Sequence, residues 1–141
     1  MLKSQRRLLP VLISLALTSS ALAAGSESKL AGTWRAQSAQ RNGAPAPDLS
    51  GHSMILSGDT FRIEKDTALL YGGTYKLSGT QQIDFHQTEG PTLRGDWKGL
   101  YRLRGSGLEI VDNADDTKKP RPNRFRTSPD SGYVLVRFQR Q

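Results

Sequence analysis

Residues 54–63, MILSGDTFRI, hold two short apolar runs on either side of a tight turn. Met54 and Leu56 precede Ser57-Gly58-Asp59, and Phe61 and Ile63 follow it. Side chains that alternate with a period of two lie on one face of a strand, so this segment predicts a β-hairpin with one buried face. The same pattern recurs along the chain, and no apolar stripe of helical period follows residue 24. The chain is therefore predicted to be all-β.

About eight short strands are expected, over residues 32–40, 54–56, 61–63, 69–77, 82–85, 97–104, 108–112 and 133–140. Consecutive hairpins favour an antiparallel up-and-down barrel, because closure removes exposed sheet edges. Gly72-Gly73 predicts a bulge or a tight bend within its strand. In the last strand, Val134, Val136 and Phe138 are expected to share one face. The polar segment 113–132 is too long for an ordinary turn, so we expect it to make contacts of its own or to carry a role.

The first residues have the three parts of a secretory signal peptide. Lys3, Arg6 and Arg7 are positive, residues 8–17 are largely apolar, and Ala21-Leu22-Ala23 is a cleavage signal. The apolar core is about half the length that a membrane-spanning helix needs. We therefore predict a cleaved signal peptide over residues 1–24, with Arg6-Arg7 leaving twin-arginine export open. The mature protein is expected to be periplasmic or secreted, with no membrane span.

Cleavage would leave residues 25–141, which is enough for one barrel domain. It would also leave 17 basic against 13 acidic residues, a net charge of +4 in place of +7. A charge this mild does not by itself predict a nucleic-acid partner, and we expect a monomer. The absence of cysteine excludes disulfides, thiolate metal sites and thiol nucleophiles. The core alone must therefore hold the fold together.

The first expected strand carries a short motif, Gly32-Thr33-Trp34, that resembles the G-x-W opening of the lipocalin and fatty-acid-binding (calycin) superfamily. In that superfamily the tryptophan closes one end of a barrel and stacks with an arginine of the final strand. The resemblance implies that Arg137 or Arg140 stacks on Trp34, as a cation–π contact.

A wider set of motifs resembles the small uncharacterised lipocalin-like domain family abundant in planctomycetes. The matching residues are Gly32-Thr33-Trp34, Phe61, Gly72-Gly73-Thr74-Tyr75-Lys76-Leu77, Ile83-Asp84, Glu89-Gly90-Pro91, Gly99-Leu100-Tyr101, Lys119-Pro120-Arg121-Pro122 and Phe125. This resemblance implies a lipocalin-like barrel and no particular activity. Residues 41–50 are too short and proline-rich for a helical lid. Arg137-Phe138-Gln139 also lacks the Arg-x-Tyr clamp of fatty-acid-binding proteins, so fatty-acid binding is not implied.

Three motifs suggest chemistry, and each is incomplete. Gly51-His52-Ser53-Met54 lacks the last glycine of a hydrolase nucleophile elbow and has no parallel sheet around it. His52 and His86 are the only histidines, and no third ligand for a metal is evident. Residues 112–116 fail the EF-hand pattern and are typical of Asx turns. We therefore predict no catalytic residue, metal or cofactor, and no enzymatic activity.

Two sets of residues are candidates for binding. The first faces the barrel interior and would hold a small apolar or amphipathic ligand: Trp34, Tyr75, Tyr101 and Arg137. The alternative is that the aromatic side chains simply fill the core. The second set lies in the basic loop, residues 118–126, and would bind a protein partner or an anionic envelope component: Lys119, Arg121, Arg124 and Arg126. The alternative there is a solvated loop pinned by Phe125 and the prolines.

The leading hypothesis is therefore an exported binding module for a small ligand. The second is an envelope-associated protein-interaction or inhibitor module that acts through the basic loop.

Overall fold

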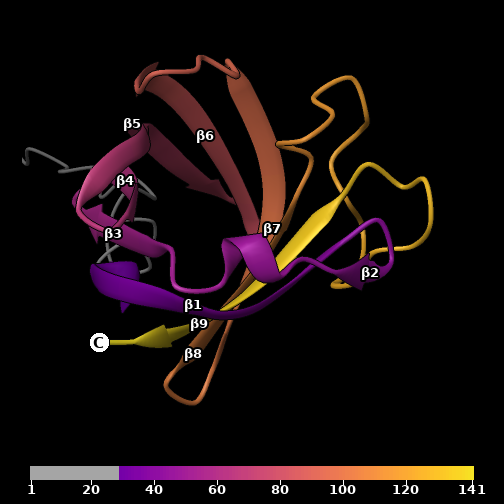
Figure 1. Cartoon of the computed structure of the whole chain (residues 1–141), viewed down its shortest axis with the longest axis horizontal. Helices are drawn as coiled ribbons and strands as arrows, with labels where there is room; N and C mark the ends of the chain where they lie inside the picture. Colours follow the sequence, from indigo (N-terminus) through magenta and orange to yellow (C-terminus); the bar gives the residue numbers. More distant parts are fainter. Residues whose placement is uncertain (1–28) are drawn as a thin grey trace, which may run out of the picture.

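The period-two segments become nine β-strands in a computed structural model that describes residues 29–141 (Figure 1). The strands are β1 (Gly32–Arg41), β2 (Ala44–Pro45), β3 (Ser53–Ser57), β4 (Thr60–Lys65), β5 (Ala68–Ser78), β6 (Gln82–Glu89), β7 (Asp96–Arg104), β8 (Gly107–Asp112) and β9 (Val134–Arg140), with a short 3-10 turn, η1 (Pro47–Leu49). The predicted signal peptide lies outside the described residues. Within the described part of the chain, no helix is long and apolar enough to cross a membrane.

The sheet is a closed antiparallel barrel of eight strands. From β3 to β9 each strand pairs with the next, β1 pairs with β3, and the pairing of β1 with β9 closes the ring. The two-residue β2 is an addition that pairs with the end of β1. The predicted all-β, up-and-down barrel is thus confirmed, as is the hairpin of β3 and β4. Of the bulge or tight bend predicted at Gly72-Gly73, the structure has the bulge, because the β5–β6 register shifts between these two residues.

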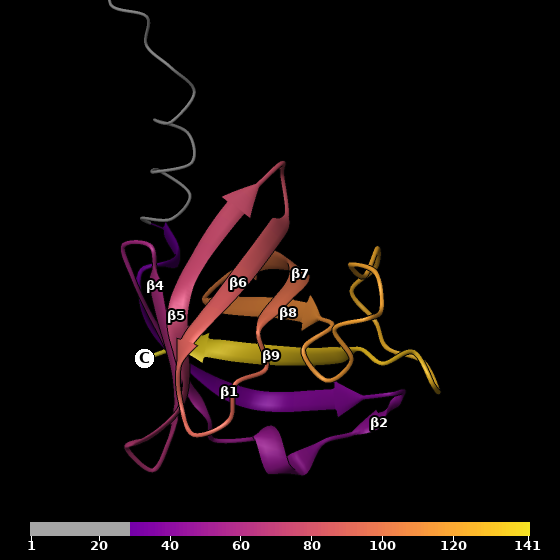
Figure 2. The ribbon, with the colours of Figure 1, turned by 90° about the horizontal axis from the view of Figure 1, so that it is seen from above.

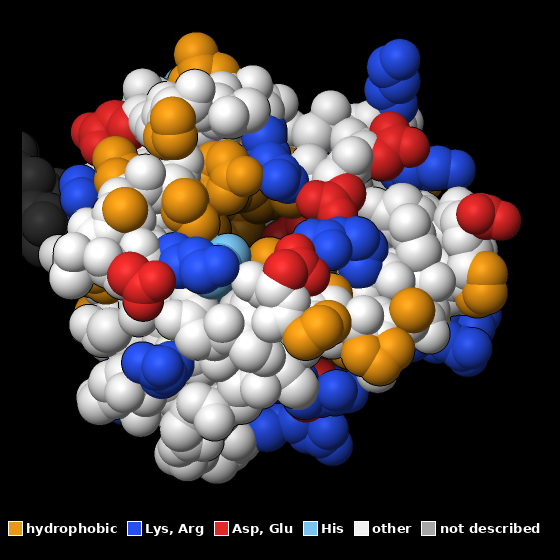
Figure 3. Space-filling view, in the orientation of Figure 1, with side chains coloured by type: hydrophobic (Ala, Val, Ile, Leu, Met, Phe, Trp, Pro, Cys, Tyr) orange, Lys and Arg blue, Asp and Glu red, His pale blue; other side chains and the backbone are white. Residues whose placement is uncertain are grey.

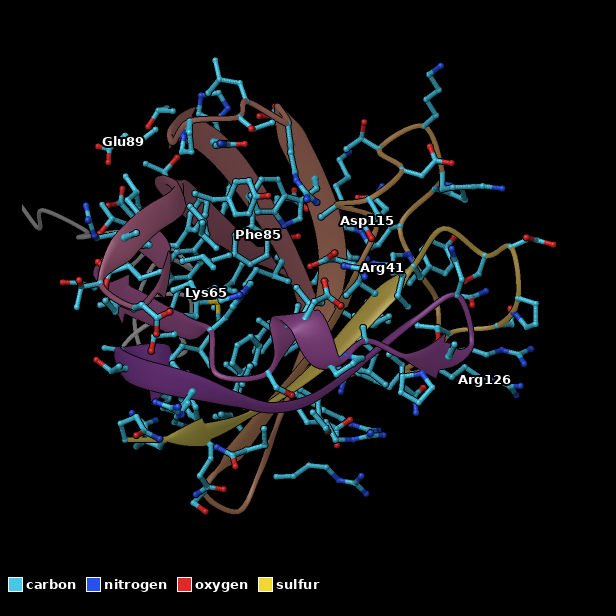
Figure 4. All side chains as sticks on the ribbon, viewed as in Figure 1. Arg41, Lys65, Phe85, Glu89, Asp115 and Arg126 are labelled. Atoms are coloured by element: carbon cyan, nitrogen blue, oxygen red, sulfur yellow. The ribbon has the colours of Figure 1, made fainter. Side chains whose placement is uncertain are left out.

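Aromatic rings fill the middle of the barrel. Phe61 contacts Phe85 and Trp97 edge-on, with centroids 5.1 and 5.5 Å apart, and Phe85 stacks on Trp97 at 5.2 Å. Phe85 lies inside the ring of strands in Figure 4. Buried aliphatic side chains surround the rings, among them Met54, Leu56, Ile83, Leu108 and Ile110. With no disulfide available, this core supplies the main favourable term in folding.

One end of the barrel is closed by Trp34, which is 1% exposed. Its indole Nε1 donates a hydrogen bond to Leu30 O at 2.9 Å. The guanidinium of Arg140 lies 4.2 Å from the ring centroid and donates to Ala31 O and Lys29 O, both at 2.7 Å. The expected stack of a final-strand arginine on Trp34 is therefore present, and its partner is Arg140.

The other end, which we call the mouth, gathers the longer connections. Figure 2 shows segment 113–133 beside the end of β1, on the side of the barrel away from the C-terminus. Segment 113–133 is tied to the barrel from its start, since Asn113 Oδ1 accepts a hydrogen bond from Lys98 N and Asn113 Nδ2 donates to Lys119 O. The expectation that this segment makes contacts of its own is confirmed.

Candidate functional site

A cavity of about 240 Å³ opens at the mouth of the barrel. Figure 3 looks onto this face and shows a recess with hydrophobic side chains inside and charged side chains around its edge. The apolar wall comes from inward-facing positions of five strands: Ala36, Ile63, Leu70, Tyr71, Trp97, Val136 and Phe138. Val134 lines the cavity as well, so the prediction that it shares a face with Val136 and Phe138 is confirmed.

A three-part ion pair crosses one side of the opening. Asp115 accepts a hydrogen bond from Arg41 Nε at 2.6 Å and one from Arg94 Nη1 at 2.8 Å. Arg41 also pairs with Asp48 of the η1 turn at 3.3 Å. Figure 4 shows Arg41 and Asp115 side by side at the edge of the barrel. Residues from β1, the β6–β7 loop and the β8–β9 segment are thereby joined over the cavity.

The ion pair fixes the charge of its members. Burial favours the neutral form of Asp115, but the hydrogen bonds and charges of Arg94 and Arg41 prevail and hold its pKa below the ordinary value. Likewise, Asp115 outweighs burial and raises the pKa of both arginines. All three groups are therefore charged at neutral pH.

Gln87 holds Arg94 in place. This side chain is buried at an inward position of β6, and its Nε2 donates to Glu89 O at 3.0 Å and to Thr92 O at 2.7 Å. Its Oε1 accepts a hydrogen bond from Arg94 N at 2.8 Å. The Arg94 guanidinium then lies 4.8 Å from the centroid of the Tyr71 ring. The β6–β7 loop is thus shaped by one amide, and its arginine covers the aromatic wall.

Asp112, the last residue of β8, brings a carboxyl group to the cavity wall. Its Oδ1 accepts a hydrogen bond from Ala114 N at 3.0 Å, which is the Asx turn expected at this point. Gly99 lies opposite it on β7, where a Cβ would overlap Val111 O and crowd the Asp112 side chain. Burial raises the pKa of Asp112 to about 7, with Asp115 adding to the shift and Arg94 opposing it.

The two histidines lie apart. His52 lines the cavity, and burial, assisted by Lys65, lowers its pKa. His86 is on the outer face of β6, where its Nδ1 is 2.5 Å from Asp96 Oδ1. Among residues 29–141, no group of His, Asp and Glu is arranged to hold a metal ion.

The four residues predicted to bind a ligand lie elsewhere in the barrel. Trp34 and Tyr75 are core residues, and Tyr101 packs against the core, but none of the three lines the cavity. The expectation of an interior Arg137 is wrong. Its Nε is 3.9 Å from Glu109 on the outer wall, because Arg137 alternates with the inward-facing Val136 and Phe138. The alternative reading, in which these aromatic residues fill the core, describes their positions.

The basic loop, residues 118–126, divides into two parts. Arg121 faces the barrel: it donates to Ile83 O, to Gly99 O at 2.9 Å and to Asp84 at 2.6 Å, so it fastens the loop and does not face a partner. Lys119, Arg124 and Arg126 are exposed. Figure 4 places Arg126 on the outer loop, away from the cavity. The guanidinium of Arg102 on β7 stacks 4.2 Å from the ring centroid of Phe125, which pins the loop as expected.

Two polar residues of the barrel's inner side, of which Asp112 lines the cavity, could have been found in the sequence. Ile83, Phe85 and Gln87 alternate, as do Leu108, Ile110 and Asp112, so period-two patterning places the polar third member of each series inside. A polar residue at an inward-facing position is therefore the feature of the sequence that would have indicated a site inside the barrel. Arg41, Arg94 and Asp115 carried no such signal, because three separate connections bring them together.

Comparison with protein-family models, with curated proteins and with solved structures found no match for this chain. The resemblance to the lipocalin-like family therefore rests on the motifs quoted above.

Proposed function

We propose that this chain is an exported, non-enzymatic binding module that holds a small apolar or amphipathic ligand in the cavity at the barrel mouth. The observation that carries the proposal is the cavity itself: a hollow with an apolar wall and a charged edge, at the open end of an otherwise filled barrel. A concave apolar site with a few convergent polar groups is the usual form of a small-molecule site. Export follows from the predicted signal peptide.

The size of the cavity limits the ligand. An apolar cavity of about 150 Å³ holds benzene, whereas drug-sized ligands occupy pockets of about 300–1,000 Å³. A cavity of about 240 Å³ suits a single substituted ring or a short branched chain. Long-chain fatty acids are too large for it.

Single-ring fragments are expected to shift the backbone amide NMR signals of Ile63, Trp97 and Val136. Replacing Ala114, which lines the opening, with phenylalanine should weaken binding about tenfold or more, because the new ring occupies the ligand's volume. The matched control is Ala44→Phe, which adds the same ring at an exposed position of β2. A screen in which no fragment shifts these signals, or in which the shifts survive Ala114→Phe, contradicts the proposal.

A second candidate function, binding of an anionic envelope component through the basic loop, is favoured by exposed Arg124 and Arg126, for which no acidic partner lies within the described residues. Reversing both to glutamate is expected to abolish retention on isolated envelope material and to leave the melting temperature unchanged. Arg121→Gln is the contrast, since it breaks contacts with the barrel wall and should lower the melting temperature. Retention that survives the double reversal would reduce the loop to a structural role.

A further inference from the structure

Among the charged side chains that line the cavity, Asp112 is the one without an oppositely charged partner in the described part of the chain. Of the carboxylates that line the opening, Asp115 binds Arg41 and Arg94, and Asp48 binds Arg41. Within residues 29–141, the one hydrogen bond to the Asp112 carboxyl comes from the amide of Ala114, and no cation makes an ion pair with it. Asp112 is half-buried at the cavity wall, and a carboxylate withdrawn from water without an ion-pair partner is costly. A cation from outside the chain would therefore supply the ion-pair partner that the ionised form of Asp112 lacks, beyond the more distant charge of Arg94.

The wall around Asp112 would suit the apolar body of such a cation. Trp97 and Phe138 line the same cavity, and Tyr71 forms its rim beneath Arg94. Aromatic faces attract organic cations as well as apolar groups. The contact of Arg94 with Tyr71 shows that a ring at this mouth already holds a cation.

We propose, as a refinement that rests on the proposed cavity-binding function, that the ligand is a small organic amine: its ammonium group donates hydrogen bonds to the Asp112 carboxylate and its apolar body packs against Trp97 and Phe138. An anionic ligand would face Asp112 and would have to displace Asp115 from two arginines. A neutral ligand would leave Asp112 without a counter-charge. One ammonium group balances the single excess negative charge among the residues that line the cavity.

The proposal has a pH signature. Asp112 must lose its proton to accept the ammonium group, and with a pKa of about 7 it is largely protonated in acid. Alkyl ammonium groups resemble lysine and stay protonated far above that pH, at a pKa of about 10.4. The affinity should therefore rise by up to about a hundredfold from pH 5 to pH 8, with release of a proton on binding. Arg94, Arg41 and Asp115 keep their charges throughout this range.

Three probes of nearly equal size separate the possibilities: 2-phenylethylamine, 2-phenylethanol and phenylacetate. Titration calorimetry at pH 8 is expected to give the highest affinity for the amine, by about tenfold or more over the other two. If the alcohol or phenylacetate binds as well as the amine, the amine assignment is overturned and cavity binding stands. If none of the three shifts the Trp97 and Val136 signals, the cavity-binding function fails for single-ring ligands.

Asp112→Asn keeps the shape of the side chain and its acceptor for Ala114 N, and removes the charge. It is expected to weaken amine binding about tenfold to a hundredfold at pH 8 and to abolish the pH dependence. His52 also faces the cavity, so a pH dependence that persists in Asp112→Asn would assign the effect to His52 and overturn the role of Asp112. Asp59→Asn, in the β3–β4 turn, is the matched control and should leave amine affinity unchanged.

Discussion

Replacing Trp34 with alanine is expected to lower the free energy of unfolding by about 3–5 kcal/mol, the usual cost of removing a large aromatic side chain from a packed core. Trp34 is among the largest fully buried side chains. Its removal also breaks the contacts that its ring makes with neighbouring groups. Without the ring, the Arg140 guanidinium loses its stacking surface, and Leu30 O loses its indole donor. Urea denaturation followed by far-ultraviolet circular dichroism measures the change.

Two variants test whether the ring itself is responsible. Trp34→Phe keeps an aromatic surface for Arg140 and loses the Nε1 hydrogen bond, so it should cost less than Trp34→Ala. Arg35→Ala changes an exposed side chain on the opposite face of β1 and should stay within about 0.5 kcal/mol of the parent. A Trp34→Ala protein as stable as Arg35→Ala would mean that the barrel end is closed by other contacts.

The fold could be predicted because its signal is local and repeated. Each strand shows its own alternation and each turn its own residues, so the hairpin of β3 and β4 could be read from ten positions. Consecutive hairpins leave few arrangements other than a meander, and closure of that meander removes its two edges. The glycine pair Gly72-Gly73 likewise predicted a bulge or a tight bend in its own strand, and the register shift there is the bulge.

The mouth could not be predicted in this way, and Arg41 shows why. Strict alternation from the inward-facing Trp34 and Ala36 would place Ser38 inside and Arg41 outside. The β1–β9 register shifts between Ala36 and Ser38, so that Ala39 and Arg41 lie opposite Val136 and Val134 on the inner side. A bulge without a glycine leaves no mark in the sequence. The partners of Arg41, which are Asp48 and Asp115, depend in turn on how two connections fold back.

The choice of Arg137 as an interior residue failed for a related reason. The last strand carries two arginines, Arg137 in its middle and Arg140 at its end, and the motif alone did not say which of them meets the tryptophan. Arg140 has the same parity as Val136 and Phe138, so it lies on the inner side beside Trp34. Arg137 has the opposite parity and joins Arg102 and Arg104 around Glu109.

Asp112→Asn is expected to make the protein more stable at neutral and alkaline pH. The unfolded chain releases the Asp112 proton near its ordinary pKa of 3.8, whereas the folded protein keeps it up to a pKa of about 7. Since the folded state binds more protons between these values, the stability of the parent falls as the pH rises through this window, and the cost stays in full above it. At 1.36 kcal/mol per pKa unit, the cost reaches about 4 kcal/mol at pH 8 and about 1–2 kcal/mol at pH 5.

The gain in Asp112→Asn should therefore grow from pH 5 to pH 8, which urea unfolding at the two pH values measures. Asp59→Asn, the same replacement in the β3–β4 turn, is the control. A loss of stability, or a gain that ignores pH, would mean that the carboxyl is solvated in the folded protein. Two arginines hold the pKa of Asp115 below its ordinary value, so the Asp115 carboxylate stabilises the fold at neutral pH. The two neighbouring carboxyl groups therefore have opposite effects on stability. The barrel has no disulfides, and it still keeps in its cavity a carboxyl group that lowers the stability of the fold. Groups with displaced pKa values concentrate at functional sites, where function commonly costs stability. The loss at Asp112 therefore lies where the proposed ligand would bind.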